Sequence, residues 1–307
     1  MKEVSEAAQI QLDEAIFEIE DEAKSLVTLE RLATFLQKTE FVPLPPSERL
    51  RQLAIALEHH SFERGWDDLR AIYHAAVELT PDDFYLHHSF GLAALAWMEE
   101  WMTPVMADRL AIAAQAERSF TRALELEPQD SDTAFGLGSL FYNHPLRKED
   151  HAAYLATAKA WYQKAIANDS TNVMAQLYVA HCCHDLAFIR ADENLWWQAV
   201  IAYEQVDQVA LARDWPLWRA VKCREQLAVC CVWAGQAAIG KQRLSAFLDE
   251  VEALVPAEDG DHEAIVNFNE LVDVVTKKLK DTVLLQRTCI QVKRFQLESL
   301  YPELYEN

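Results

Sequence analysis

The stretch AHCCHDLAF at residues 180–188 contains two histidines and two cysteines, the side chains that zinc prefers in proteins. Successive residues on a helix are turned by about 100°, so the side chains of Cys182 and Cys183 diverge. His181 and His184 are three residues apart and share one side of the helix. A structural zinc site needs four ligands, and no third and fourth ligand lie nearby at usable spacing. We therefore predict no bound metal and interpret the two cysteines as packing residues.

No other part of the chain carries a recognisable catalytic motif. The seven glycines are scattered singly and form no phosphate-binding loop, dinucleotide-binding turn or nucleophile elbow. His262 and Glu263 begin like a zinc-peptidase helix, but Val266 stands where the second histidine is needed. The lysines within residues 277–280 are interpreted as a cation cluster at a helix C-terminus. We predict a protein that is not an enzyme and that uses no cofactor.

The composition predicts the kind of elements that must position these side chains. The chain of 307 residues is about half hydrophobic, which is enough to bury one large core or several small ones in a row. Glycine and proline are few, and Ala, Leu, Glu and Gln outweigh the β-branched residues. We therefore expect an all-α fold.

The charge and the cysteines restrict the partners and the compartment. A formal charge of −21 argues against direct nucleic-acid binding, which needs clustered Lys and Arg. The acidic first 22 residues are interpreted as a solubilising face, with docking of a basic partner as the alternative. We expect neither a membrane span nor a signal peptide, because no long apolar run occurs. Six cysteines within helical patterns predict free, buried thiols and a cytoplasmic location.

Three segments share one residue pattern, and a weaker fourth copy follows. They read LRAIYHAAVELTPDD from residue 69, AERSFTRALELEPQD from 116 and AKAWYQKAIANDSTN from 158. Each copy begins with a small or apolar residue, and an aromatic residue stands four positions later. An Ala follows three positions after the aromatic residue, and a residue that ends the helix stands five positions after the Ala. The matching positions are Leu69, Tyr73, Ala76 and Pro81; Ala116, Phe120, Ala123 and Pro128; Ala158, Tyr162, Ala165 and Ser170; and, in the weaker copy, Ala199, Tyr203, Val206 and Leu211.

Each stop is followed by a second helical pattern that pairs a large residue with a very small one. The pairs are Phe90–Gly91, Leu137–Gly138 and Val179–Ala180, and they predict close approach of a neighbouring helix. Together the two patterns resemble the tetratricopeptide repeat (TPR) family, whose signature runs W-x2-L-G-x2-Y, A-x3-F and P. The resemblance is clearest over residues 66–211. It implies a right-handed α-solenoid built from pairs of helices.

The repeats are longer than the family's usual 34 residues. Their aromatic motifs begin at residues 69, 116, 158 and 199, and the extra residues fall between the two helices of each pair. We expect lengthened helices or long loops there. The four nearby tryptophans should then cover neighbouring helices or a partner; they are Trp97, Trp101, Trp196 and Trp197.

Helical patterns of lower fidelity flank the repeats and predict three regions. Residues 1–60 are expected to form an N-terminal helical cap, and residues 61–215 the TPR-like repeats. Four more helix candidates follow Pro216, so residues 216–307 should continue or cap the solenoid. Such caps are needed because a terminal repeat otherwise exposes an apolar face.

The resemblance also implies a binding surface, because the first helix of each TPR lines a concave groove that receives a partner segment. The candidate partner-binding residues in that lining are Tyr85, His88, Phe135, Ser139, Tyr142, Tyr178, His181 and His184. Leu92, Asp132 and Met174 complete it. Members that capture chaperone tails clamp a carboxylate with Lys, Arg and Asn, and none of these stands at the positions named here. We therefore expect a different kind of ligand.

The leading hypothesis is a non-catalytic scaffold or adaptor that binds another protein through a peptide or helix in this groove. The first alternative is a regulatory or sensor subunit that binds a metal or small ligand through His88, His181 and His184. The second is a helical enzyme with a polar pocket after residue 216. We expect no direct nucleic-acid or membrane partner, and the sequence leaves the identity of the partner and the oligomeric state open.

Overall fold

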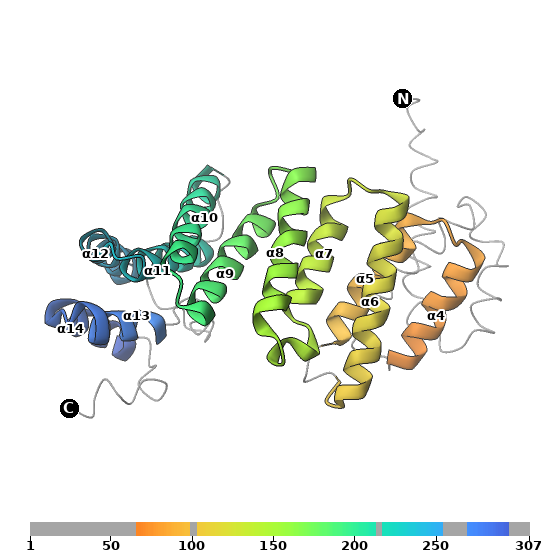
Figure 1. The fold of residues 1–307 in the computed structure, drawn as a ribbon, viewed down its shortest axis with the longest axis horizontal. Helices are drawn as coiled ribbons and strands as arrows, with labels where there is room; N and C mark the ends of the chain where they lie inside the picture. The colour runs from red at the N-terminus through yellow and green to blue at the C-terminus, as the bar shows by residue number, and fades with distance from the viewer. Residues whose placement is uncertain (1–65, 99–102, 213–216, 254–268, 295–307) are drawn as a thin grey trace, which may run out of the picture. The chain divides into compact units, whose positions relative to one another are not determined.

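A computed structural model describes residues 66–98, 103–212, 217–253 and 269–294 (Figure 1). Every regular element in these ranges is helical and none is a strand, which confirms the all-α prediction for them. The chain divides into two compact units, Met1–Asn168 and Asp169–Asn307, each considered by itself below. The predicted N-terminal cap lies outside the described residues.

The first unit consists of helices that pack against their neighbours in the chain. In order they are α4 (Trp66–Leu79), α5 (Phe84–Trp97), α6 (Met106–Leu126), α7 (Ser131–Tyr142), the short 3₁₀ helix η3 (Pro145–Lys148) and α8 (His151–Asn168). The most extensive contacts join α5 to α6 and α7 to α8, and α5 also contacts α7. The first unit is therefore a series of helix pairs, with α5 and α7 as the first members of two successive pairs.

The first helix of each pair begins at a side-chain cap. Asp83 accepts a hydrogen bond from the backbone N–H of Leu86, at the start of α5. Asp130 does the same for Thr133 at the start of α7. Such caps satisfy backbone donors that have no partner within the helix. Both follow a predicted stop by two residues, so the same sequence feature ends one pair and starts the next.

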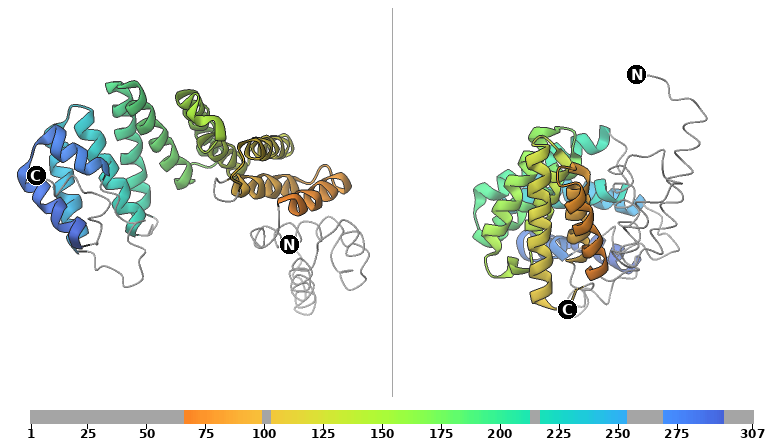
Figure 2. Two further views of the ribbon diagram at one scale, coloured as in Figure 1. Left: turned by 90° about the horizontal axis from the view of Figure 1, so that it is seen from below. Right: turned by 90° about the vertical axis from the view of Figure 1, so that its right-hand side faces the viewer.

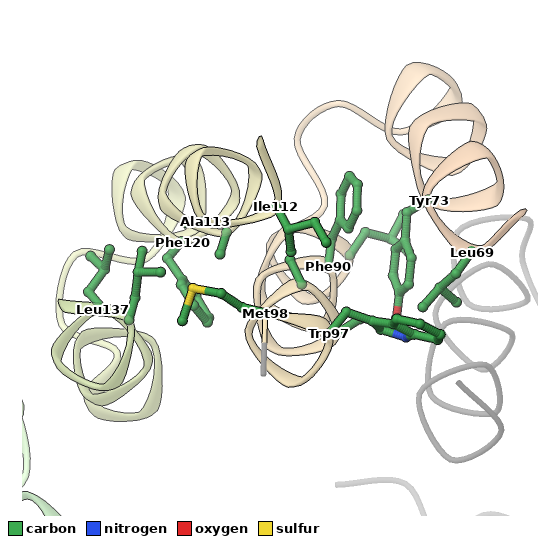
Figure 3. Packing of buried hydrophobic residues seen from close by; sticks show 14 of the residues in the cluster. Leu69, Tyr73, Phe90, Trp97, Met98, Ile112, Ala113, Phe120 and Leu137 are labelled. Carbon is green, nitrogen blue, oxygen red and sulfur yellow. The ribbon is translucent and has the colours of Figure 1, made fainter. Parts of the chain in front are cut away.

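The repeated positions of the sequence form the core. The small, aromatic and alanine-like positions of all four copies are at most 3% exposed, from Leu69 to Val206. In the first unit the ring of Tyr73 stacks on that of Phe90 at 4.7 Å. Figure 3 shows Leu69, Tyr73 and Phe120 among the side chains that point into the space between the helices of this unit. The aromatic residue of each copy is thus a packing residue, as its spacing predicts.

The glycines of α5 and α7 make room for these aromatic rings. A Cβ atom at Gly138 would lie 2.5 Å from the ring of Tyr162 in α8. The ring of Phe120 in α6 meets two glycines, because Cβ atoms at Gly91 and Gly136 would lie 2.5 and 2.7 Å from it. The predicted close helix approach is confirmed at Gly91 and Gly138.

The described part of the second unit also consists of helices (Figures 1 and 2). Its elements are α9 (Val173–Arg190), α10 (Glu193–Ala212), α11 (Leu217–Trp233), α12 (Ala237–Ala253), α13 (Asn269–Asp273), the π-helical segment η4 (Val274–Leu279) and α14 (Thr282–Arg294). The four helix candidates predicted after Pro216 are confirmed over their described residues. Helix α10 continues through Leu211, so the fourth copy of the repeat has no stop there.

The extra length of the α9–α10 repeat lies in its helices. Helices α9 and α10 contain 18 and 20 residues. Only Ala191 and Asp192 separate them, and Ala191 ends α9 in the left-handed conformation. Trp196 is buried, and Trp197 packs against the same core, so both cover neighbouring helices. Trp101 lies outside the described residues.

Arginine side chains hold the helices of the second unit together across their surfaces. Arg224 of α11 bonds Asp207 of α10 at 2.9 Å and Glu250 of α12 at 2.6 Å. Arg287 of α14 bonds two acids of α12 and the hydroxyl of Ser245. A network of this kind fixes helix orientation more firmly than isolated surface pairs do.

All six cysteines are free thiols, and five of them are buried. Burial raises the pKa of Cys223 to about 12, so this thiol stays protonated and unreactive near neutral pH. Cys289 is the exception to the prediction, because it is only partly buried. Its helix, α14, packs mainly on α12 and leaves one side exposed.

Candidate functional site

Helix α5 leaves one line of residues accessible. Eight of its 14 residues are buried, and the predicted site residues Tyr85 and His88 lie on the remaining side with Leu92. Their spacing of three and four places them on one helix face. Tyr85 is half exposed, at 50%, and its ring meets Phe84 edge-on at 5.1 Å. A partner can therefore reach a Tyr ring here without any rearrangement of the core.

His88 connects this line to the next helix. Its Nδ1 atom is 2.8 Å from the hydroxyl of Thr133 in α7, and its ring stacks on Phe84 at 5.7 Å. Burial lowers the pKa of His88, although the carboxylates of Asp130 and Asp132 oppose the shift. The imidazole is thus neutral near pH 7, and it acts as a hydrogen-bonding link between α5 and α7.

Helix α7 contributes a second line at the same spacing. Phe135 is half-buried, with its ring 5.4 Å from that of Tyr162. Tyr142 is also half-buried, and the guanidinium of Arg147 lies 4.8 Å from its ring centre. Ser139 is 9% exposed, and its Oγ accepts a hydrogen bond from the Tyr162 hydroxyl at 3.3 Å. Phe135 and Tyr142 therefore remain accessible in part, whereas Ser139 serves the packing of α7 on α8.

The predicted site residues of α9 belong to the second unit. His181 Nδ1 is 2.8 Å from the Tyr203 hydroxyl of α10, and its ring meets Tyr178 edge-on at 5.7 Å. His184 is 6% exposed and packs edge-on against Trp196 at 5.2 Å. Tyr178 and His181 keep partial exposure, but His184 presents almost no surface to a partner.

Charge is divided between the two helices of each pair in the first unit. Helices α5 and α7 contain no Lys or Arg, and Asp132 is the one charged residue within them. Their partners α6 and α8 carry all the Lys and Arg of these pairs outside the α7–α8 connection. The sequence carries this signal, because Lys and Arg are absent from residues 84–97 and 131–142, whereas repeat position alone does not reveal it. Thr133 and Arg147 give no such signal, because their roles depend on contacts with His88 and Tyr142 that a repeat pattern does not show.

No model of a protein family matches the sequence, and no curated protein matches it either. Among solved structures, the chain is similar to PilW, described as a widely conserved type IV pilus biogenesis factor. The identity is 18%, the TM-score is 0.48, and the match covers 84% of this chain and 96% of PilW.

The described helices contain neither a candidate membrane span nor a candidate metal site. None of them combines the length and the apolar character needed to span a bilayer. Within the described ranges, no three side chains of His, Cys, Asp or Glu come together as a metal site. His88 and His181 each bond a hydroxyl group of another helix instead.

We expect purified protein to contain well under one zinc per chain. Cys182 and Cys183 are buried, and the two histidines beside them serve packing and hydrogen bonding. Elemental analysis measures the zinc content directly, and a chelator should leave the melting temperature unchanged. Near-stoichiometric zinc, with unfolding when the chelator is added, would contradict the prediction.

Proposed function

We propose that the protein is a non-catalytic scaffold that binds a segment of another protein along α5 and α7. In this proposal the helix pairs form a TPR-like right-handed solenoid, and the two helices line its concave side. The main support is the single accessible line on each helix, which carries Tyr85 on α5 and Phe135 and Tyr142 on α7. Aromatic side chains of this kind offer large contact areas at a small cost in conformational entropy.

The residue chemistry supports binding rather than catalysis. His88 is neutral and bonded to Thr133, which suits a structural link between the two helices. Without Lys or Arg, α5 and α7 have no cation to clamp a terminal carboxylate. The partner is therefore proposed to bind through apolar and aromatic contacts. The free, mostly buried thiols suit a reducing compartment, and the cytoplasm remains the proposed location.

Site-specific photocrosslinking tests where the partner binds. A photoreactive phenylalanine analogue at position 85 should crosslink a partner in cells of the native host. The same analogue at Gln163, an exposed residue of α8, is the matched control and should give no such product. Crosslinking from position 163 alone would place the partner on the opposite helices and contradict the proposal.

Replacing Phe135 and Tyr142 together by Ala should weaken binding of the identified partner by about 2–4 kcal/mol, as expected for central aromatic anchors. Titration calorimetry measures the loss, and circular dichroism must show that the helices are intact. Ile201→Ala is a suitable control, because it removes a large apolar side chain that is 53% exposed on α10 and lies in neither proposed site. Affinity that survives the double change but is lost on altering Trp101 and Trp197 would move the site to the insertions.

A further inference from the structure

The second unit contains a depression of about 500 Å³ that the proposed function does not use. It lies where the α9–α10 turn, the end of α11 and η4 meet, and its volume is in the range of small-ligand sites, roughly 300–1,000 Å³. The lining consists of Ala187, Phe188, Ala191, Glu193, Trp196, Trp233, Gly235 and Lys278. All of these residues belong to the same unit.

One wall of the depression is aromatic. The rings of Trp196 and Trp233 stack with their centres 5.7 Å apart and their planes at 15°. Trp196 is buried and held edge-on by His184, whereas Trp233 keeps partial exposure. Phe188 stands in the same lining and is 68% exposed. The depression therefore offers an indole face fixed by packing and a second ring that is open to solvent.

An ammonium group already rests on this wall. The Nζ atom of Lys278 lies 4.1 Å from the centre of the Trp233 ring. Within the described part of the chain, Lys278 has no carboxylate at ion-pair distance. Its neighbour Lys277 instead bonds Asp273 at 2.7 Å. The Trp233 face thus holds a cation through the ring itself, which is the geometry of a cation–π contact.

The lining also offers negative charge to a cation. Glu193 lines the depression and, among the described residues, pairs with no Lys or Arg. The C-terminal end of α11 borders the depression and has no basic residue in its last turn, and a helix C-terminus carries partial negative charge. Phe188, Trp196 and Trp233 add the negative faces of their aromatic rings. Lys278 is the single cation in the lining, and its exposed side chain is free to swing away.

We propose that this depression binds an organic cation with an alkylammonium group. The ammonium takes the place of Lys278 on the Trp233 ring, Phe188 covers its alkyl groups, and Glu193 supplies the opposite charge. Lys278 acts as an internal competitor that occupies the site when no ligand is bound. The ligand is either a free small quaternary amine or a methylated lysine side chain of another protein, since both present the same chemistry.

Titration of the 307-residue protein with choline, followed through the indole N–H signals in NMR spectra, tests the proposal. The neutral analogue 3,3-dimethylbutan-1-ol has nearly the same shape without the charge. Choline should shift the Trp233 signal at concentrations where the neutral analogue does not. Equal shifts by the two compounds would overturn the proposal, because apolar contact alone would then account for binding.

Two lysine variants distinguish the effect of Lys278 on the ring face from the effect of a change in net charge. Lys278→Met should bind choline about tenfold more tightly, because it frees the ring face. Lys277→Met removes the same charge one residue away and should bind like the unaltered protein. A Lys278→Met variant with unchanged or weaker choline binding would overturn the proposal. The proposal would also fail if the unaltered protein bound acetate in this depression and Lys278→Met abolished that binding, because the site would then recognise anions.

Two further variants and a second probe complete the test. Glu193→Gln should weaken choline binding several-fold, and Trp233→Leu should remove it, with circular dichroism as the check on folding. Unaltered affinity in Glu193→Gln would count against the assigned counter-charge. A peptide that carries trimethyl-lysine, compared with choline, distinguishes the sources, and the tighter ligand identifies whether the cation is free or part of a protein.

Discussion

Gly138→Leu is expected to destabilise the protein by about 3 kcal/mol or more, at the upper end of typical overpacking costs. A Cβ atom at this position would already lie 2.5 Å from the Tyr162 ring, and Leu adds three further carbon atoms. Both residues are buried, so the ring can move aside only if α7 and α8 separate. Urea unfolding monitored by circular dichroism measures the change in free energy.

Two additional variants make the Gly138 result specific. Gln163→Leu places the same side chain at an exposed position of α8 and should change stability by less than about 0.5 kcal/mol. In the double variant Gly138→Leu with Tyr162→Ala, the new side chain gains the space of the ring. Its loss should be smaller than the sum of the two single losses, which is the signature of direct contact. An additive double variant, or an unchanged melting temperature for Gly138→Leu, would contradict the assigned packing.

Phe120→Ala is expected to cost about 3–5 kcal/mol, the usual range for removing a buried aromatic ring. Phe120 is fully buried, and its ring fills the space above Gly91 of α5 and Gly136 of α7. Glycines have no side chain with which to fill the cavity, so the collapse that moderates such losses is limited here. Chemical denaturation again gives the free energy of unfolding.

Phe188→Ala is the matched control for Phe120→Ala. It removes the same atoms from a ring that is 68% exposed, so its effect should stay within about 0.5 kcal/mol. A loss below about 1 kcal/mol for Phe120→Ala would show that the ring is not clasped between the two glycines, because transfer of a buried ring from water alone exceeds that value.

The packing of this fold could be predicted well from the sequence, because it depends on local spacing. Tyr73, Phe120, Tyr162 and Tyr203 recur at one position of a helical pattern, and all four are buried. The prediction succeeded because a helix surface repeats every three to four residues, so a core position is visible within a single segment.

The candidate site was harder to predict, because its contacts join segments far apart in the chain. The partner of His88 is Thr133, which lies 45 residues away. His184 shares a helix side with His181 in the sequence pattern, yet it is buried because Trp196 of the next helix covers it. A single-helix pattern carries no information about such neighbours. The same reason explains why the depression beside Trp233 gave no sequence signal.

The position of Phe120 also restricts how this protein can evolve by gain or loss of repeats. The ring of Phe120 packs against Gly91 of α5, in its own helix pair. It also packs against Gly136 of α7, in the following pair. A duplication or deletion with its junction between α6 and α7 would leave this ring facing a foreign helix. Recombination at that point is tolerated only when the incoming helix carries a glycine in the register of Gly136. Changes of length at the α5–α6 and α7–α8 connections, by contrast, leave the junction between α6 and α7 intact.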